Sequence, residues 1–316
     1  MKTEQVAVIG LGIALVALAT LWEFRAGLPK QTSVEITPES LTIGEQHPKL
    51  WLFYNDSDVN SRWWYDFGAR SSRAINIPLL NLLYEKIAVF NGQQYTIEVI
   101  TGLEGLAYRL GGWDQLPIPL RNPKARVSTA EEDWIRACVL ARWGGLWLSP
   151  SVICLRPFGE LPQDKIVAFG LDEDPLIGSA QRDAPGFKAL WVPQPNHPMM
   201  VLWESKCRDR LENQLAGRQI RGDAKSDWWE LQDLIGPAEH RIREELGRDV
   251  RTGKKLELED LLATGTGGRL PFRIPDTAVY VPIPYTDLVD RRMFGWILRS
   301  SEEQILSSDI AIRYLL

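Results

Sequence analysis

Two pairs of polar residues between positions 133 and 151 have types and spacings that could do chemistry. Asp133 and Arg136 lie three residues apart in a segment whose apolar residues have helical spacing, so they could form an ion pair on one helix face. Ser149 and Ser151 flank Pro150 directly after an apolar run. A hydroxyl is a much weaker ligand for Mg²⁺ or Mn²⁺ than a carboxylate, so this serine pair predicts no metal site by itself.

The elements that position these pairs follow from the local sequence. Ser128 or Thr129 can cap a helix, because an acidic residue lies three positions after each of them and completes a capping box. Gly144 and Gly145 end that helix, since a chain that leaves a helix commonly needs a positive φ angle. Residues 146–148 then predict a short buried strand. A helix, a turn and a strand that ends in polar residues is how α/β sheets form sites at strand ends.

The rest of the chain predicts a domain of alternating strands and helices. The first strand is expected in residues 48–54, and a helix is expected from Pro78, because proline suits the first turn of a helix. Further strands are predicted at 94–100, 165–170 and 278–284, and further helices at 102–112 and 198–207. We therefore predict an α/β fold.

The stretch from 133 to 151 resembles the core motif of the DXD-containing sugar transferases of the capsular polysaccharide synthesis and glycosyltransferase family 32 group. Their motif runs D-x-x-R, a few apolar residues, G-G, an apolar triplet and then D-x-D. Here Asp133, Arg136 and the two glycines fall in place, but Ser149 and Ser151 stand where the carboxylates should be. The resemblance, which covers roughly residues 47–240, implies a glycosyltransferase A-like nucleotide-binding core.

The same resemblance implies a nucleotide-sugar site. Asp133 would contact the nucleotide, and Arg136 would either orient the motif or bind the phosphates, although a plain helix ion pair explains both residues equally well. The family's G-P element corresponds to Gly236 and Pro237, which a simple turn also explains. The candidate nucleotide-sugar-binding residues are therefore Asp133, Arg136, Gly144, Gly145, Ser149, Ser151, Gly236 and Pro237. No catalytic residue is identified.

A metal cofactor would need ligands other than the usual ones. In the family the two carboxylates hold a divalent metal that bridges the diphosphate, and a histidine near the C-terminus often completes the site. Here no histidine follows His240. Mn²⁺ or Mg²⁺ would need carboxylates from elsewhere, and two acidic turns could supply them, Asn55–Asp58 and Asp172–Asp174. Such turns are more often simple turn formers or solvated loops.

Residues 6–22 form an apolar segment without a charged residue. A helix of this length spans roughly 25 Å, which is enough to cross a hydrocarbon core. Ala17–Ala19 matches an A-x-A cleavage site, so a removable signal peptide is the alternative. We expect residues 1–25 to be a transmembrane anchor, 26–46 a tether and 47–316 a glycosyltransferase-like α/β domain. This organisation predicts a single-pass membrane protein.

The net charge, the three cysteines and His197 bear on which partners and ligands the chain could bind. A net charge of −5 and a pI near 5.5 argue against nucleic-acid binding. Cys138, Cys154 and Cys207 form no C-x-x-C pair, and core packing is the simplest interpretation. His197 could be a ligand or a proton carrier, but its place before a proline at a predicted helix start is more typical of a structural role.

Three functional hypotheses follow. The first is a membrane-anchored glycosyltransferase of hexosyltransferase type, which moves a sugar from a nucleotide-sugar to a glycan or other acceptor. Its leaving diphosphate needs positive charge, from a metal or from Arg and Lys side chains. The second is an inactive subunit of the same fold, with a structural or partner-binding role in a membrane-associated assembly. The third is a sugar-binding module with Trp63, Trp64, Trp228 and Trp229 as its platform. Charged groups that converge on the serine pair would favour catalysis.

Overall fold

The computed structural model describes residues 47–59, 75, 77–172, 184–218, 227–228, 230–231, 240–243 and 247–316. All of them belong to one compact unit. The predicted anchor and tether lie outside these residues. Within the described part of the chain, no helix is long and apolar enough to span a membrane.

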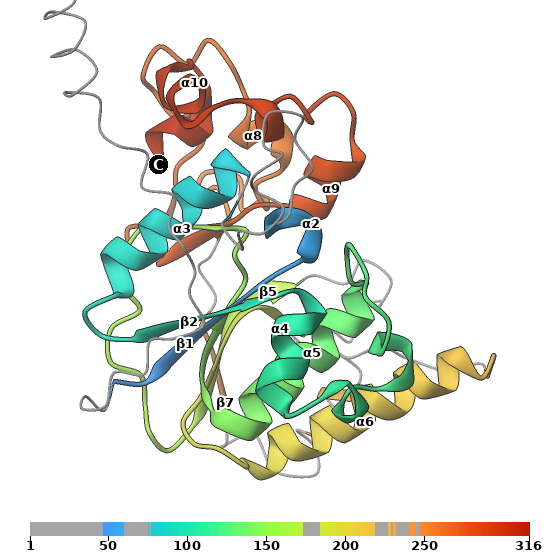
Figure 1. Ribbon diagram of the computed structural model, residues 1–316. Helices are drawn as coiled ribbons and strands as arrows, with labels where there is room; N and C mark the ends of the chain where they lie inside the picture. The colour runs from blue at the N-terminus through green and yellow to red at the C-terminus, as the bar shows by residue number, and fades with distance from the viewer. Residues whose placement is uncertain are drawn as a thin grey trace, which may run out of the picture. The chain divides into compact units, whose positions relative to one another are not determined.

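A six-stranded sheet in the order β2-β1-β3-β6-β5-β7 forms the centre of the unit (Figure 1). Its strands are β1 (Lys49–Tyr54), β2 (Thr96–Thr101), β3 (Gly145–Leu148), β5 (Ile166–Asp172), β6 (Ala184–Val192) and β7 (His240–Arg243). β1 pairs in parallel with β2 and β3, and β5 pairs in parallel with β7, whereas β6 is antiparallel to β3 and β5. The strands other than β6 therefore point the same way, and their carboxyl ends meet at one edge, here called the carboxyl edge.

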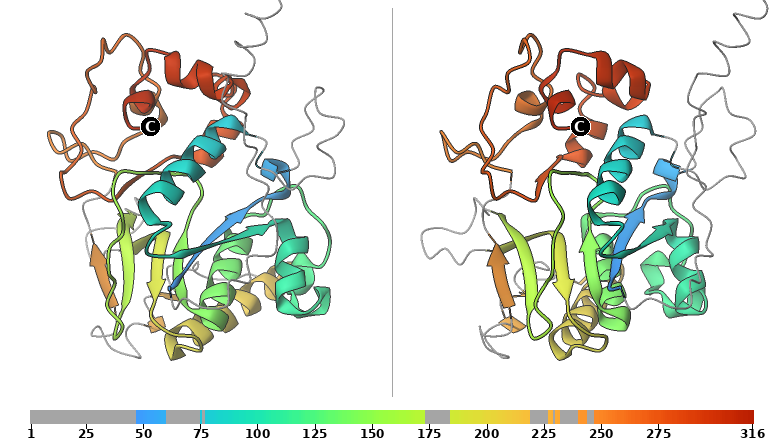
Figure 2. Two further views of the ribbon diagram at one scale, coloured as in Figure 1. Left: turned by 60° about the vertical axis from the view of Figure 1, so that its left-hand side comes forward. Right: turned by 90° about the vertical axis from the view of Figure 1, so that its left-hand side faces the viewer.

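Helices cover both faces of this sheet. One face packs against α4 (Gly102–Leu110), α5 (Thr129–Trp143) and α6 (Pro198–Leu215), and the other packs against α3 (Pro78–Asn91) and the C-terminal elements (Figure 2). Side chains alternate along the strands, so Trp51 and Trp147 face α5 while Leu52 and Leu146 face α3. The predicted α/β class is confirmed.

The shorter elements complete the unit. A two-stranded sheet pairs β4 (Val152–Cys154) with β8 (Tyr280–Pro282) in antiparallel fashion. The short helices are α2 (Asp56–Val59), η2 (Trp113–Gln115), η3 (Ile118–Leu120), α8 (Leu258–Leu261), α9 (Tyr285–Asp290), η5 (Ile297–Arg299), α10 (Glu302–Ser307) and η6 (Ala311–Tyr314). Ser149 to Ser151 therefore form the link between the large and the small sheet.

The local predictions for the central stretch are confirmed. The Ser128 hydroxyl accepts a hydrogen bond from the Glu131 amide, and the Glu131 carboxylate accepts one from the Ser128 amide, which together form the predicted capping box. Gly144 ends α5 with a φ angle of +61°. The helix that begins at Pro198 is longer than predicted and runs to Leu215, because its buried side continues through Cys207 to Leu211.

Candidate functional site

The carboxyl edge collects several of the segments that the sequence singled out. α2 follows β1 there, α4 begins directly after β2, and the serine pair follows β3. Asp172, the first residue of the predicted acidic turn 172–174, ends β5 at the same edge, and the rest of that turn lies outside the described residues. α5 leads into β3 through a tight turn, so its first turn also points toward this edge. Open α/β sheets bind ligands outside the carboxyl ends of their strands.

The two serines of the Ser-Pro-Ser link are hydrogen-bonded to each other. Their Oγ atoms lie 3.0 Å apart, and the residues are only 4% and 5% exposed. The Ser149 amide donates to the Lys188 carbonyl at 2.7 Å, and the Ser151 carbonyl accepts from the Ile283 amide at 2.8 Å. The link is thus fixed between β6 and the segment after β8. Two neutral hydroxyls that engage each other do not fit a divalent cation.

No alternative metal site is found in the part of the chain that the structure describes. There, no three or more His, Cys, Asp or Glu side chains gather closely enough to hold a metal ion. The turn Asn55–Asp58 reaches the carboxyl edge, but its carboxylates do not join such a group. Among the described residues, Arg and Lys side chains are the sources of positive charge for an anionic ligand at this edge.

Arg136 is occupied by interactions within the fold. Its Nη1 donates to Asp133 Oδ1 at 2.7 Å and its Nη2 donates to Glu132 Oε1 at 3.2 Å. The guanidinium carbon lies 5.7 Å from the centre of the Trp147 ring and 5.6 Å from that of Phe187, and the residue is 5% exposed. The helix ion pair considered from the sequence is therefore formed, between α5 and the sheet.

Gly144 and Gly145 lie at the other end of β3. Gly145 has a φ angle of +93°, and a Cβ atom there would lie 2.5 Å from the Lys49 carbonyl oxygen. The Gly144 carbonyl accepts a hydrogen bond from the Trp51 indole at 2.8 Å. Across the four residues of β3, this end is roughly 13 Å from the serine pair. The structure does not bring these glycines together with Ser149 and Ser151, and Gly236 and Pro237 lie outside the described residues.

Asp58 is the main surprise at the carboxyl edge. It is buried with 4% exposure, and its Oδ1 accepts hydrogen bonds from Tyr285 Oη at 3.2 Å and from Ser57 Oγ at 3.3 Å. Burial raises the pKa of this carboxyl group, and the positive charge of Arg126 opposes the rise. The sequence favoured a simple turn former here. The buried environment of Asp58 instead makes it a functional-site candidate.

A short series of hydrogen bonds connects Asp58 to the serine pair. The Tyr285 amide donates to the Ile283 carbonyl at 2.8 Å, and the Ile283 amide donates to the Ser151 carbonyl at 2.8 Å. The turn after β1 and the link after β3 therefore contact the same segment, Ile283–Tyr285. Figure 1 shows the corresponding helices, α2 and α9, side by side.

Arg126 and Tyr54 complete this group, which we call the Asp58 cluster (Tyr54, Asp58, Arg126 and Tyr285). The Arg126 guanidinium lies over the Tyr285 ring, 5.5 Å from its centre. Tyr54 Oη is fully buried and has no hydrogen-bond partner among the described residues. Burial, followed by the charges of neighbouring groups including Asp58, raises the Tyr54 pKa. Sequence reasoning missed all but Asp58, since no local motif links these positions.

Three other sequence candidates have structural explanations. His197 is buried at the start of α6, after the carboxyl end of β6 and so at the opposite edge of the sheet. Burial raises the pKa of Cys138 and of Cys154 to about 12, which fits core thiols. Trp228 is fully buried against Phe187 and Trp203, so it cannot serve as a sugar platform. The other tryptophans of that platform, Trp63, Trp64 and Trp229, lie outside the described residues.

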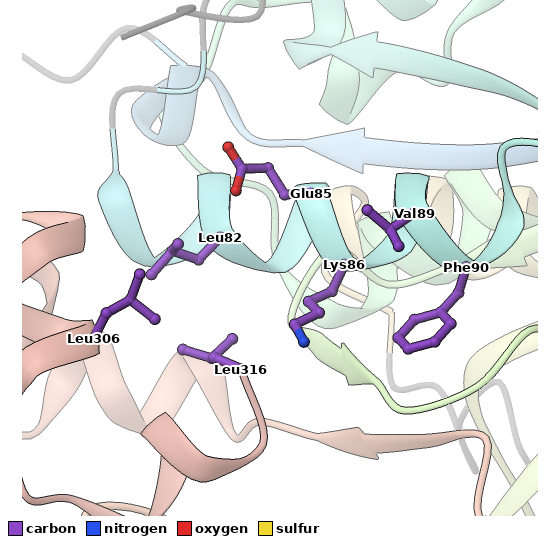
Figure 3. A pocket seen from close by; sticks show the side chains of 7 residues that line it. All are labelled: Leu82, Glu85, Lys86, Val89, Phe90, Leu306 and Leu316. Atoms are coloured by element: carbon purple, nitrogen blue, oxygen red, sulfur yellow. The ribbon is translucent and has the colours of Figure 1, made fainter. Parts of the chain in front are cut away.

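A cavity of about 230 Å³ lies elsewhere, between α3 and the C-terminal elements (Figure 3). Its lining residues are Leu82, Glu85, Lys86, Val89, Phe90, Leu306 and Leu316. Burial and the nearby charge of Glu302 raise the pKa of Glu85. The cavity is mainly apolar, with Glu85 and Lys86 as its charged lining residues, and it is not formed by the residues of the carboxyl edge.

Comparison with known proteins adds little to this geometry. No protein-family model and no curated protein matches the chain. Among solved structures, the chain is similar to PaToxG Glycosyltransferase at a TM-score of 0.39 and 12% sequence identity, over 61% of this chain and 70% of that one. Likeness at this TM-score does not establish a shared fold. The functional argument therefore depends on the chain's own residues.

Proposed function

We propose that this chain is a glycosyltransferase with a glycosyltransferase A-like core, which binds a nucleotide-sugar at the carboxyl edge and transfers the sugar to a glycan or other acceptor. One observation carries the proposal. The Ser-Pro-Ser link at 149–151, the turn at 55–58 and the loop that contains Arg126 meet at the edge where parallel α/β sheets bind ligands. The resemblance of residues 133–151 to the DXD-type transferases supports the same assignment.

The proposed transfer does not use a metal at the serine pair. Departure of a nucleoside diphosphate concentrates negative charge on its phosphates, and a transferase must stabilise that charge. Two mutually bonded hydroxyls cannot do so, and Arg136 is already paired with Asp133 and Glu132. The positive charge must therefore come from another side chain at this edge. Hydroxyls of the link could still donate hydrogen bonds to the sugar or a phosphate after local rearrangement.

A membrane location is part of the proposal. Residues 6–22 are apolar and uncharged, and their length suits one membrane crossing. We expect the full chain to stay in the membrane fraction after extraction with alkaline carbonate. Release into the supernatant would contradict anchoring and leave the proposed transfer reaction unaffected.

An inactive subunit of the same fold is the second candidate. The observation that favours it is the hydrogen bond between Ser149 and Ser151, because two buried hydroxyls that bond each other leave less hydrogen-bonding capacity for a ligand. This candidate predicts that the carboxyl edge binds no nucleotide.

Calorimetric titration of the full chain in mild detergent separates the two candidates. The ligands are UDP and GDP, each with Mn²⁺ and each with EDTA. The transferase proposal predicts binding of a nucleoside diphosphate that persists in EDTA, followed by release of sugar from the matching nucleotide-sugar. Absence of binding to both nucleotides, in protein that unfolds cooperatively, would contradict the proposal and favour the inactive subunit.

A further inference from the structure

The loop before α5 and the first half of that helix contain four cationic side chains, and three of them have partners. Arg121 donates to the carbonyls of Leu116 and Asp114. Lys124 forms an ion pair with Glu131, and Arg136 pairs with Asp133 and Glu132 as described above. Arg126 differs from all three, because it makes no hydrogen bond or ion pair with any residue that the structure describes, and its guanidinium lies over the face of the Tyr285 ring.

The main chain on both sides of Arg126 is nevertheless fixed. The Ala125 carbonyl accepts a hydrogen bond from the Ser57 amide at 2.9 Å, and the Val127 amide donates to Asn55 Oδ1 at 2.9 Å. The guanidinium is in turn supported by the Tyr285 ring. A half-buried arginine held at three points has lost much of its freedom before any ligand arrives. Such preorganisation lowers the entropy cost of binding.

Arg126 and the serine link both contact the segment Ile283–Tyr285. Tyr285, which supports the guanidinium, is joined to Ser151 through Ile283 by two main-chain hydrogen bonds. The nearest acidic neighbour is Asp58, but its Oδ1 accepts from Tyr285 and Ser57, and Arg126 donates to neither of its oxygens within the described contacts. Arg126 is therefore not held in a salt bridge with Asp58. Its N–H donors are available to an anion.

We propose that Arg126 binds the diphosphate of the nucleotide at the carboxyl edge and supplies the positive charge that a metal ion supplies in DXD-type enzymes. This inference rests on the proposed function, and it names the residue that recognises the leaving group. A planar guanidinium suits the task, because it donates two parallel hydrogen bonds to phosphate oxygens. Lys188 is the natural competitor, since its carbonyl accepts from the Ser149 amide and its side chain is half-buried.

Titration of the wild type and four variants, Arg126→Gln, Arg126→Lys, Lys188→Gln and Arg269→Gln, with UDP, GDP and inorganic pyrophosphate, in EDTA and with Mn²⁺, tests the inference. Arg126→Gln should weaken binding about 10- to 100-fold, because it removes charge-assisted hydrogen bonds. Arg126→Lys should recover part of the loss, since it keeps the charge but not the two-donor geometry. Arg269→Gln changes an exposed arginine in the loop beside the C-terminal Tyr314 and should leave binding unchanged, which makes it the matched control. The unfolding temperature of each variant shows whether it is folded.

The outcomes separate this inference from the proposed function. If the wild type binds none of the three ligands either in EDTA or with Mn²⁺, the proposed function and the role of Arg126 both fail. If the wild type binds and Arg126→Gln binds equally well, only the role of Arg126 fails. The role also fails if Lys188→Gln loses binding while Arg126→Gln keeps it, or if wild-type binding requires Mn²⁺. Binding of pyrophosphate that equals that of UDP and GDP would identify a general diphosphate site.

Discussion

The segment that carries the sequence resemblance and the cluster around the buried Asp58 are different parts of the molecule. In the segment 133–151, the arginine is paired and stacked, Gly145 accommodates a close approach of β1, and the two serines bond each other. Arg136 Nε and Trp147 Nε1 are buried there without a hydrogen-bond partner among the described residues. In the Asp58 cluster, a carboxylate is buried, a tyrosine hydroxyl lacks a partner and a guanidinium makes no hydrogen bond within the described residues.

This difference shows that resemblance and binding capacity need not lie in the same residues. A motif can persist because it builds a helix, a turn and a strand, even when its chemical groups are directed inward. Residues that bind a ligand must instead keep polar groups that the fold leaves unsatisfied. The Asp58 cluster meets that condition, and it is assembled from three segments far apart in sequence. If this comparison is right, substitutions in the two regions should have different consequences.

The largest effect is expected for Gly145→Ala. The new methyl group would lie 2.5 Å from the Lys49 carbonyl oxygen at a φ angle of +93°, so steric overlap and backbone strain combine. We expect a loss of about 4 kcal/mol in the free energy of unfolding, measured with urea. Gly159→Ala is the control, because its φ angle is +70° but nothing lies within 4 Å of the added methyl. It should lose only about 1 kcal/mol. Equal losses would mean that Gly145 is not a packing residue.

Introduction of the two carboxylates of the DXD-type motif should have the next largest effect. In the double variant Ser149→Asp, Ser151→Asp, two carboxylates would occupy a buried site where the hydroxyls are 3.0 Å apart. Their repulsion and desolvation should cost about 3 kcal/mol in EDTA. At a concentration of about 100 times its Kd, Mn²⁺ should raise the free energy of unfolding of this variant by about 2.7 kcal/mol, because it binds only the folded form.

The matched control for this variant removes both hydroxyls together. Ser149→Ala, Ser151→Ala should stay within about 1 kcal/mol of the wild type, since neither hydroxyl is left without its partner. Thermal unfolding with and without Mn²⁺ measures both variants. A loss in the Asp variant that Mn²⁺ does not reduce would show that the link is not arranged like a metal-binding motif. It would also weaken the resemblance on which the proposed fold depends.

The sequence predicted those structural features that depend on residues close together in the chain. The capping box at Ser128, the turn at Gly144 and the proline at the start of α3 each depend on residues within one or two helical turns. Alternation of side chains then places Trp147 and Leu146 on opposite faces of the sheet. These features fix the α/β class and bring the serine pair to a strand end.

The sequence could not predict contacts that join distant segments. Asp58 and Tyr285 are 227 positions apart, and nothing near Tyr285 marks it as the partner of a carboxylate. The turn at 55–58 contains residues typical of any solvated turn, so its burial depends on the C-terminal segment that covers it. Arg136 fits a family motif, but only the packing of α5 on the sheet shows that its guanidinium is stacked between Trp147 and Phe187.

A more specific test of the Asp58 cluster uses pH. Because the pKa of Asp58 is raised in the folded protein, the folded state binds more protons than the unfolded state between the unfolded pKa, about 3.9, and the higher folded pKa. The free energy of unfolding should therefore fall as pH rises through that interval and then stay lower. Tyr54 and Tyr285, whose pKa values are raised by burial, stay protonated throughout this range.

Asp58→Asn should remove this contribution. The difference in unfolding free energy, wild type minus variant, should decrease from about pH 4 toward neutral pH and then become constant. Urea denaturation at several pH values measures it. A difference that rises with pH would show that Asp58 has a lowered pKa and acts as a simple ion-pair partner of Arg126.

The smallest effects on stability are expected for substitutions of two tyrosines within the Asp58 cluster. Tyr54→Phe removes a buried hydroxyl that has no partner among the described residues, so it should leave the protein equally stable or stabilise it by about 1 kcal/mol. Tyr285→Phe is the matched substitution, but it removes the hydrogen bond to Asp58 at 3.2 Å and should cost about 1 kcal/mol. Opposite signs for two tyrosines in one cluster would show that Tyr54 Oη is unsatisfied in the ligand-free protein. Tyr54→Phe could instead destabilise the protein and also weaken the binding of UDP or GDP. In that case the Tyr54 hydroxyl has a hydrogen-bond partner in the free protein and contributes to ligand binding. Tyr54 would then belong with Arg126 among the binding residues.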